Sequence, residues 1–345
     1  KIMSILIDNK INIIVVSNEP WGNIWFSKQH YAFELAKLGH QVFFINPTAK
    51  WKWTNLVSTT IKLEVINKQL SVLTYRNNFP QGGNITKYFV RLNDFLNCLK
   101  IKNKLKLDDS PTIWWKFDPY RFLKTSYFNN SKQIYHVVDP HLHLWQNDIQ
   151  AEKSNLIVCT SNKYIQYYKN KGYANVLKIS HGVSEDEYDV DINKTSLIRK
   201  EYGDYVIIIG SIASDVNIRL LERIANEQIN ILVIGPETVK SGEWNMIKKH
   251  KNLHYLGEMH SKELKNYIAA AKAGLIIYNF ISKQKGQVSR SPLKALNYLA
   301  QEKPVITSID SEIPDLNNEG IYWAKNENEA IKFVEKEMVN LCPCH

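Results

Sequence analysis

The residues from Arg290 to Asn297 form a candidate anion site at the start of a predicted helix. Ser291 is of a type that caps helices, and Pro292 suits the first helical position, which needs no N–H donor. The free N–H groups and the positive end of the helix dipole attract phosphate or carboxylate groups. Lys294 adds a full positive charge one turn into the helix. This arrangement predicts a site for a nucleotide diphosphate.

A second candidate group follows a predicted buried strand. The segment Tyr-His-Val-Val-Asp-Pro-His-Leu-His places titratable side chains at that strand end, where α/β sheets hold reactive groups. A carboxylate or imidazole there can take the proton of an attacking hydroxyl. The candidates for this general base are Asp139, His136, His141 and His143. The alternative role for Asp139 is to cap a turn.

Several tryptophans also follow predicted strands, namely Trp21, Trp25, Trp51, Trp53 and Trp145. Their flat faces can pack on the apolar faces of sugars or anchor at a membrane surface, and core packing is the alternative. Trp21, Gly22 and Trp25, together with His143, are therefore candidates for binding a carbohydrate acceptor.

Residues 85–107 form a basic amphipathic segment. Its apolar stripe consists of Phe89, Leu92, Phe95, Leu96 and Leu99, and its basic residues are Lys87, Arg91, Lys100, Lys102, Lys104 and Lys106. The pattern fits a peripheral membrane helix, or a helix that packs on a sheet and leaves its basic face in water. The candidate membrane contacts are Lys100, Lys102, Lys104 and Lys106.

The formal net charge of +10 lies mainly in the first half of the chain. Residues 1–190 contain 24 Lys and Arg against 15 Asp and Glu, whereas residues 191–345 contain 20 against 19. The basic half predicts an anionic partner. A membrane leaflet is favoured over nucleic acid, because no nucleic-acid motif accompanies the charge.

Two series of strands and helices must position these groups. Strands of the first series are predicted at 11–16, 41–45, 70–74, 111–115, 133–138, 156–159 and 176–179, with helices at 27–38 and 162–171. Strands of the second series are predicted at 205–209, 229–234, 253–256, 274–278 and 305–307, with helices at 217–226, 261–273 and 327–339 and from Ser291. Apolar strands that alternate with helices indicate parallel sheets covered on both faces.

The chain is therefore predicted to form two Rossmann-like α/β domains, residues 1–185 and 186–345, that face each other across a cleft. Residues 184–202 are charged and poor in apolar runs, so they are predicted to link the domains. No Gly-x-Gly-x-x-Gly fingerprint, Walker lysine loop, Gly-x-Ser-x-Gly elbow or His-Glu-x-x-His motif occurs. Cys342, Cys344 and His345 resemble only half a metal site.

Short motifs occur along the chain in the order found in one enzyme family. They are Pro20-Trp21, Gly39-His40, Ser180-His-Gly-Val183, Gly235-Pro-Glu237, Leu253-His-Tyr-Leu-Gly257 and the segment from Pro292-Leu-Lys294 to Lys303-Pro-Val305. On these motifs the chain resembles GT-B glycosyltransferases over about residues 11–338. The likeness is to enzymes of bacterial exopolysaccharide assembly, such as those of teichuronic acid synthesis and the xanthan glucuronosyltransferase.

The resemblance implies that the second domain binds a nucleotide sugar and that the first binds the acceptor. The implied donor-binding residues are Arg290, Ser291 and Lys294 for the diphosphate, Gly210 for a close backbone approach, Tyr278 for phosphate or ribose, and Glu258 for the base. Asn297 stands where many retaining relatives carry glutamate, and Ser289 stands at the second such position. The resemblance therefore implies inverting transfer with Asp139 as general base, and it leaves a weakened or inactive enzyme open.

The predicted function is transfer of a hexosyl or glycuronosyl group from a UDP-sugar, with UDP-glucuronic acid as one candidate, to a lipid-linked or polysaccharide acceptor. The enzyme is expected in the cytoplasm, peripheral on the inner face of the membrane, in exopolysaccharide or capsule assembly. Its expected partners are the nucleotide sugar, the lipid-linked glycan and an anionic membrane surface, without nucleic acid, metal or cofactor. The alternatives are a non-catalytic scaffold that binds nucleotide or glycan, and a sugar-nucleotide epimerase.

Overall fold

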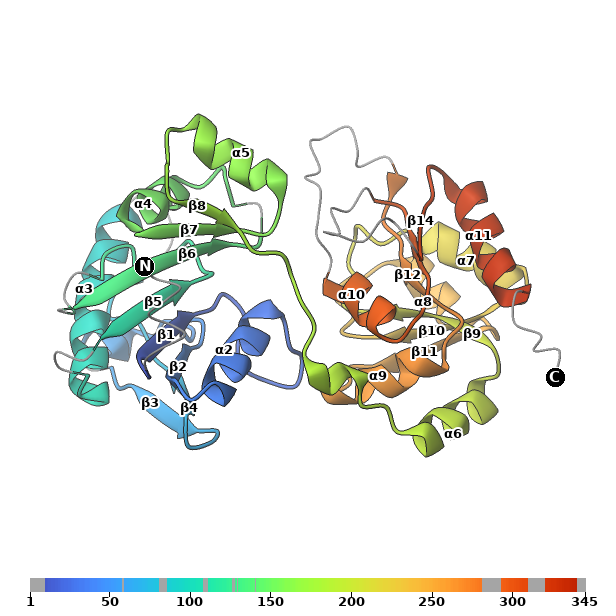
Figure 1. Cartoon of the computed structure of the whole chain (residues 1–345), viewed down its shortest axis with the longest axis horizontal. Coiled ribbons are helices and arrows are strands. Elements are labelled where there is room, and N and C mark those ends of the chain that lie inside the picture. Colours follow the sequence, from blue (N-terminus) through green and yellow to red (C-terminus); the bar gives the residue numbers. More distant parts are fainter. Residues whose placement is uncertain are drawn as a thin grey trace. The chain divides into compact units, whose positions relative to one another are not determined.

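The computed structural model describes residues 10–57, 59–80, 86–107, 111–125, 128, 130–139, 141–280, 293–309 and 320–339. The chain divides into two compact units, residues 1–179 and 180–345. Each unit contains a mainly or wholly parallel β-sheet with helices packed on both faces (Figure 1). This confirms the predicted α/β class with two parallel-sheet domains.

The first unit has an eight-stranded sheet. In spatial order its strands are β3 (Lys62–Val65), β4 (Leu70–Thr74), β2 (Gln41–Ile45), β1 (Asn12–Val16), β5 (Thr112–Lys116), β6 (Ser131–Val137), β7 (Leu156–Cys159) and β8 (Val176–Lys178). All neighbours are parallel except β3 and β4. The chain winds outward in both directions from β1, so the carboxyl ends of β1 and β5 form a topological switch point, where such sheets hold ligands.

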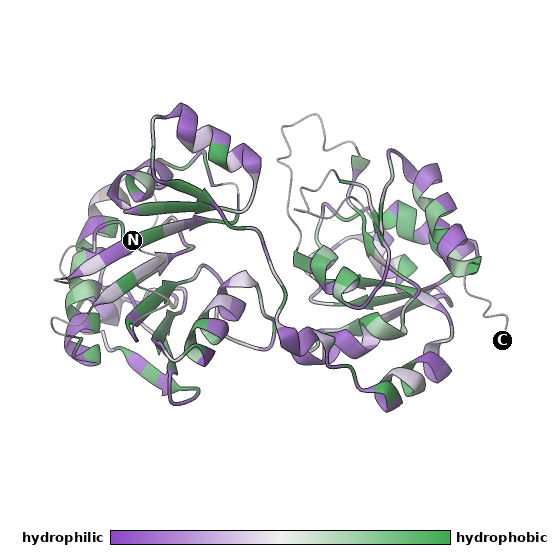
Figure 2. Ribbon diagram, viewed as in Figure 1, coloured by the Kyte–Doolittle hydropathy of each residue, from purple (hydrophilic) through white to green (hydrophobic). Residues whose placement is uncertain are grey.

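The helices of this unit are α2 (Ser27–Lys37), η1 (Trp53–Leu56), α3 (Thr86–Leu105), α4 (Trp145–Lys153) and α5 (Asn162–Asn170). Alternate residues of β1 point to opposite faces of the sheet. Ile13 and Val15 share a core with α2, and Ile14 and Val16 share a core with α3. Strands buried on both faces must be nearly continuous apolar runs, and Figure 2 shows apolar residues concentrated in the strands.

The second unit has a six-stranded, wholly parallel sheet. Its spatial order is β11 (Leu253–Gly257), β10 (Asn230–Ile234), β9 (Tyr205–Ile209), β12 (Ala273–Ile276), β13 (Val305–Thr307) and β14 (Ile321–Trp323). Its helices are η2 (Glu185–Tyr188), α6 (Ile192–Tyr202), α7 (Ile218–Asn226), α8 (Gly242–Ile247), α9 (Ser261–Ala270), α10 (Leu293–Ala300) and α11 (Glu327–Val339). One core joins the sheet to α7, α8 and α11, and the other joins it to α6, α9 and α10.

The prediction of a linker at residues 184–202 is wrong. Most of this segment forms η2 and α6, and Ile198 of α6 belongs to the same core as α9. Asp191 caps α6, because its carboxylate accepts a hydrogen bond of 3.0 Å from the Lys194 N–H. The helix escaped prediction because Thr195 and Ile198 are its only buried side chains, which leaves no apolar run to read.

Candidate functional site

The predicted donor-binding residues of the second unit lie at one edge of its sheet. Because all six strands are parallel, their carboxyl ends share that edge. Gly210 directly follows β9, Glu258 directly follows β11, and Tyr278 lies two residues beyond β12. Gly210 and Glu258 are exposed, and Tyr278 is half-buried.

Two glycines, Gly210 and Gly235, leave part of the backbone at this edge without side chains. Gly210 has φ +108°, a conformation that side chains rarely adopt, and its N–H donates to the Ile234 carbonyl at 2.9 Å. Gly235 has φ +150°, and a Cβ atom there would clash with the carbonyl oxygen of Gly210. The loops after β9 and β10 can therefore lie this close together only with glycine at position 235.

Lys294 joins this edge from the start of α10. Its Nζ lies 5.0 Å from the centre of the Tyr278 ring and 3.9 Å from the position that a Cβ atom on Gly210 would take. The structure thus brings together Gly210, Tyr278 and Lys294, three of the residues that are predicted to bind the donor. Asn297 lies half-buried almost one turn later on the same helix. Arg290 and Ser291, with Ser289, lie outside the described residues.

Two residues that the sequence did not single out hold this arrangement in place. Ser308, buried directly after β13, accepts a hydrogen bond from the Tyr278 N–H at 2.7 Å and donates to the Tyr278 carbonyl at 3.0 Å. Tyr298 of α10 accepts from the Ile209 N–H at 2.9 Å, and a Cβ atom on Gly274 would clash with its ring. The position of Ser308 directly after a buried strand is the signal that could have found it.

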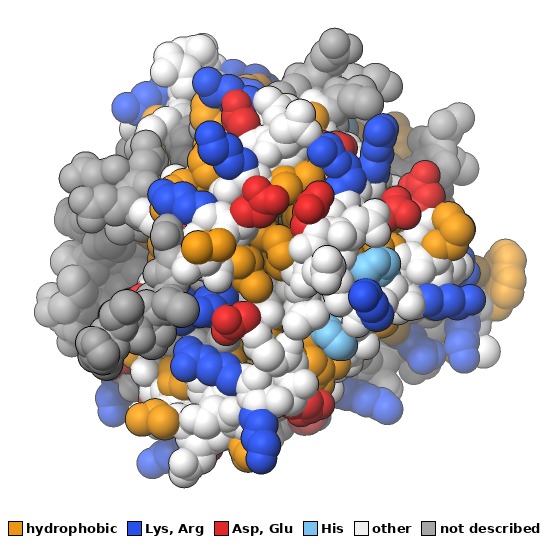
Figure 3. Space-filling view, turned by 90° about the vertical axis from the view of Figure 1, so that its right-hand side faces the viewer, with side chains coloured by type: hydrophobic (Ala, Val, Ile, Leu, Met, Phe, Trp, Pro, Cys, Tyr) orange, Lys and Arg blue, Asp and Glu red, His pale blue; other side chains and the backbone are white. Residues whose placement is uncertain are grey.

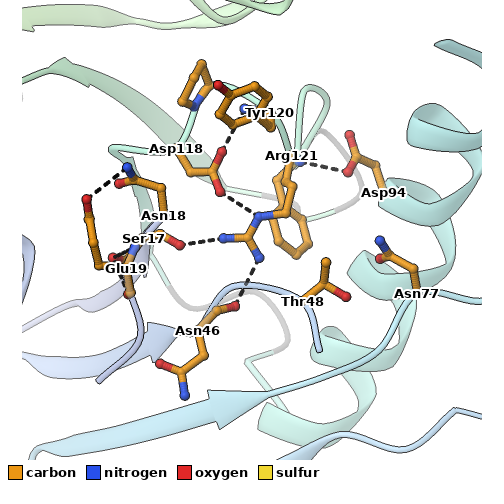
Figure 4. Close-up of polar contacts among 12 residues, drawn as sticks. Ser17, Asn18, Glu19, Asn46, Thr48, Asn77, Asp94, Asp118, Tyr120 and Arg121 are labelled. Atoms are coloured by element: carbon orange, nitrogen blue, oxygen red, sulfur yellow. Dashed lines mark hydrogen bonds and ion pairs between the residues drawn. The ribbon is translucent and has the colours of Figure 1, made fainter. Parts of the chain in front are cut away.

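A buried arginine, Arg121, lies at the switch point of the first unit (Figure 4). Arg121 is 4% exposed, and its Nε lies 2.6 Å from a carboxylate oxygen of Asp118. It also donates to the Tyr75 hydroxyl at 2.6 Å and to the carbonyls of Asn46 and Ser17 at 3.0 and 2.5 Å. These acceptors follow β5, β4, β2 and β1, so one guanidinium ties four strand ends together.

Replacing Arg121 with leucine is expected to lower the free energy of unfolding by about 3–5 kcal/mol, because Asp118 would be left as an uncompensated buried charge. Urea unfolding followed by circular dichroism measures the change. The matched control is Arg76→Leu on the exposed neighbour of Tyr75, with an expected change below about 0.5 kcal/mol. Equal stability of the two variants would contradict this role for Arg121.

The segment that carries Arg121 is held by two buried ionisable groups, Lys116 of β5 and Asp94 of α3. The Lys116 ammonium donates to the Phe122 carbonyl at 2.6 Å, and burial lowers the pKa of Lys116 to about 7. Asp94 of α3 accepts from the N–H groups of Phe122 and Leu123, each at 2.7 Å, and burial raises its pKa to about 7. These bonds attach α3 to the switch point through a polar contact.

Asp139, the candidate base, lies two residues beyond β6, with its side chain 47% exposed. Its carboxylate is 3.3 Å from the ammonium of Lys28, which is buried in the first turn of α2. The same ammonium is 3.0 Å from the carboxylate of Glu19, which follows β1. Burial raises the pKa of Glu19 against the opposing attraction of Lys28. The sequence predictions missed Glu19, although a carboxylate just after the first buried strand was a readable signal.

The three histidines near Asp139 have different surroundings. His136 is wholly buried in β6, where its Nδ1 accepts from the Trp115 indole N–H at 3.1 Å and its ring stacks on Phe117 at 4.7 Å. His141 is half-buried, and its backbone N–H donates to the Asp139 carbonyl at 2.8 Å. Burial lowers the pKa of the His141 imidazole. His143 is exposed. Asp139 is therefore the candidate base with both solvent access and a fixed partner.

The predicted acceptor residues Trp21, Gly22 and Trp25 lie in the loop between β1 and α2. The two indole rings are 5.3 Å apart and half-buried, and Trp21 also contacts Phe44 at 5.1 Å. Trp25 donates from its indole N–H to the carbonyl of the exposed Gly22 at 3.1 Å. The loop thus presents a partly exposed aromatic surface beside Glu19.

Helix α3 has an unusual distribution of polarity. Among its described side chains, the buried ones are Val90, Asn93, Asp94, Asn97, Cys98 and Ile101, and half of these are Asn or Asp. Its exposed apolar residues are Tyr88 (79%), Leu92 (40%), Phe95 (38%) and Leu99 (38%). Lys104 and Lys106 are exposed and Lys102 is half-buried, whereas the Lys100 ammonium bonds to Asn78 and Thr59. The helix therefore presents apolar and basic side chains together on its outer face.

Among the residues that the structure describes, no cluster of three or more His, Cys, Asp or Glu side chains is arranged to hold a metal ion. Cys342, Cys344 and His345 lie outside that part of the chain. Asp189 and Asp191 form an Asp-x-Asp pair, but Asp191 is engaged in capping α6. Figure 3 shows basic side chains interspersed with acidic ones over the face that it presents.

Solved structures share this fold. An α,α-trehalose-phosphate synthase (UDP-forming) from Burkholderia vietnamiensis is 11% identical with a TM-score of 0.65, over 96% of this chain and 90% of that one. WaaG, a glycosyltransferase involved in lipopolysaccharide biosynthesis, is 12% identical with a TM-score of 0.62, over 95% and 90%. UDP-GlcNAc 2-epimerase from Methanocaldococcus jannaschii is 12% identical with a TM-score of 0.54, over 97% and 94%. No family model and no curated protein matches the sequence.

Proposed function

We propose that this protein is a glycosyltransferase that moves a sugar from a UDP-sugar to a lipid-linked or polysaccharide acceptor in exopolysaccharide assembly. The observation that carries the proposal is the meeting of Lys294, Tyr278 and the bare backbone at Gly210 on the carboxyl edge of a parallel sheet. An ammonium group beside backbone that carries no side chain suits a diphosphate. The fold is shared with glycosyltransferases, one of them named as UDP-forming, which supports the choice of donor.

In the proposed reaction an acceptor hydroxyl attacks the anomeric carbon of the donor. The new carbon–oxygen bond forms as the bond to the diphosphate breaks, and the leaving UDP keeps that electron pair. Asp139 takes the hydroxyl proton, and Lys294 stabilises the charge on the diphosphate. The single displacement inverts the anomeric centre, in keeping with an amide at Asn297 in place of the glutamate of retaining relatives. UDP-glucuronic acid is one candidate donor.

A panel of UDP-, GDP- and dTDP-sugars with a lipid-linked acceptor tests the proposal. The expected result is release of UDP that depends on the acceptor. Conversion of a UDP-sugar into its epimer without release of UDP would instead identify an epimerase. That second candidate is favoured by the shared fold of the UDP-GlcNAc 2-epimerase and by the paired carboxylates of Glu19 and Asp139. Binding without any conversion would identify a scaffold.

We also propose that the outer face of α3 binds an anionic membrane, which would bring the enzyme to a lipid-linked acceptor. The exposed Leu92, Phe95 and Leu99 would enter the headgroup region, with Lys102, Lys104 and Lys106 beside them. Within the described ranges, none of the helices has the length and apolar character that a bilayer crossing requires. Attachment through this face would therefore be peripheral.

Reversing charge on this face is expected to weaken binding to vesicles. Each lysine near an anionic surface contributes about 1 kcal/mol, so the Lys102→Glu, Lys104→Glu, Lys106→Glu variant should bind at least about 100-fold more weakly. Sedimentation with phosphatidylglycerol-containing vesicles measures the loss. The control carries the same charge change in the other unit, at the exposed Lys249, Lys251 and Lys262. Equal binding by both variants would remove α3 from the proposal.

A further inference from the structure

A buried lysine joins two carboxylates that come from different strand ends. The Lys28 side chain is 3% exposed, and its Nζ lies 3.0 Å from Glu19 and 3.3 Å from Asp139. We propose that Lys28 is a positioning residue for the transfer reaction, held by Glu19 and in turn fixing the carboxylate of Asp139 for its role as base. This inference rests on the proposed function.

Glu19 is the fixed side of the cluster. The Asn18 side-chain amide donates to one Glu19 carboxylate oxygen at 3.0 Å, and the other oxygen contacts Lys28. The Ser17 hydroxyl accepts from the Glu19 N–H at 3.1 Å and donates to the Glu19 carbonyl at 2.7 Å. The Glu19 side chain is 23% exposed, compared with 47% for that of Asp139. Asp139 is therefore the carboxylate with room for an incoming hydroxyl.

The position of Lys28 is set by the fold. It is the second residue of α2, and the next residue, Gln29, locks the preceding loop: its side chain accepts from the Phe26 N–H at 3.0 Å and donates to the Pro20 carbonyl at 2.9 Å. A lysine buried this deeply needs opposite charge beside it. Glu19 and Asp139 bring carboxylates to it from two different strand ends.

The effect of Lys28 on the ionisation of Asp139 depends on the charged groups around both residues. Asp118 at the end of β5 adds negative charge, which Arg121 neutralises, and His141 packs beside Asp139. Without Lys28, Glu19 and Asp139 would face each other as like charges in a partly dry site. Like charges oppose ionisation, so the pKa of the base would rise and Asp139 would stay protonated to higher pH. Without Glu19, Lys28 would attract Asp139 alone and that pKa would fall.

Two variants test this inference with opposite expected signs. In Lys28→Met, the acidic limb of the kcat/KM profile should move up by about one pH unit, which corresponds to about 1.4 kcal/mol. In Glu19→Gln, the same limb should move down. Lys28→Arg should restore most of the wild-type profile, since it keeps the charge. The control is Lys37→Met, which removes an exposed lysine of the same helix that pairs with Glu34 at 3.1 Å. Its profile should not move.

Carbon-13 NMR titration of the Glu19 and Asp139 carboxyl groups gives a readout that needs no turnover. The Asp139 midpoint should rise in Lys28→Met and fall in Glu19→Gln. Midpoints that stay at their wild-type values in both folded variants would overturn the positioning role, whatever the activity. Failure of every donor to react would overturn the proposed function. The NMR midpoints would still show whether Lys28 and Glu19 control the ionisation of Asp139. If Lys28→Met does not fold, the direction in which the Asp139 midpoint moves in Glu19→Gln decides between the two outcomes.

Discussion

Replacing Asp139 with asparagine is expected to lower the rate of sugar transfer about 10²–10⁴-fold, the range that a general base contributes. Asparagine has nearly the same shape but cannot accept the hydroxyl proton at neutral pH. Donor affinity should be unchanged, because the residues proposed to bind the donor lie in the second unit. Steady-state release of UDP and calorimetric titration with UDP separate the two effects.

The control for this substitution is Asp148→Asn. Asp148 is also an exposed carboxylate of the first unit paired with a lysine, at 2.7 Å from Lys171. Its loss should leave the rate within about twofold, since surface ion pairs contribute little. An Asp139→Asn enzyme as fast as this control would mean that another group takes the proton, and Glu19 would be the next candidate.

Replacing Lys294 with alanine is expected to lower kcat/KM about 10²–10³-fold, the effect of losing one group that stabilises developing charge. Affinity for UDP should fall as well, because the diphosphate would lose the ammonium group that is proposed to bind it. The measurements are initial rates over a range of donor concentration and calorimetry with UDP.

The second unit offers a closely matched control for Lys294. The Lys336 ammonium lies 4.9 Å from the centre of the Tyr322 ring, almost the same geometry as Lys294 over Tyr278 at 5.0 Å. Lys336→Ala removes a contact between α11 and β14, and neither residue is a candidate for donor binding. The transfer rate and the affinity for UDP should therefore not change. If both variants bind UDP as tightly as the wild type, the diphosphate lies elsewhere.

The strands were the most predictable part of the fold. The strand predicted at 205–209 is β9 with the same bounds, and the one predicted at 11–16 is β1 (Asn12–Val16). Continuous apolar runs specify such strands locally, because parallel strands are buried on both faces. Helix α6 was missed, since its few buried side chains give no such signal.

Helix α3 shows where a pattern misleads about orientation. Hydrophobic periodicity alone would turn Leu92, Phe95 and Leu99 toward the sheet. The helix instead buries Asp94, which accepts two backbone N–H bonds at the switch point, and so leaves the apolar side chains outside. Specific hydrogen bonds to a distant loop cannot be read from residue types along one helix. Lys100 was likewise expected to face a membrane, but its ammonium bonds to Asn78 and Thr59. The sequence of the helix does not reveal these partners.

Some candidate site residues could be singled out because they directly follow a predicted strand or begin a predicted helix. The strand end that carries Asp139 and the helix start that carries Lys294 were readable from the sequence, whereas Gly210 was singled out through the family resemblance. The pairing of Lys28 with Glu19 and Asp139 was not predictable, because Lys28 and Asp139 are 111 residues apart and meet only in the folded chain. His136 was an alternate to Asp139 as the general base, and the structure separates the buried imidazole ring from the accessible carboxylate.

Proton NMR of a reaction between a UDP-α-sugar and its acceptor tests the proposed transfer most directly, since it follows the donor, the nucleotide and the product in one sample. We expect the donor anomeric signal to be replaced by UDP and by a β-linked anomeric signal on the acceptor. With Asp139→Asn, the same conversion should be slower by about two orders of magnitude or more. An α-linked product would contradict inversion by Asp139, and an epimerised UDP-sugar with no glycoside formed would contradict sugar transfer itself.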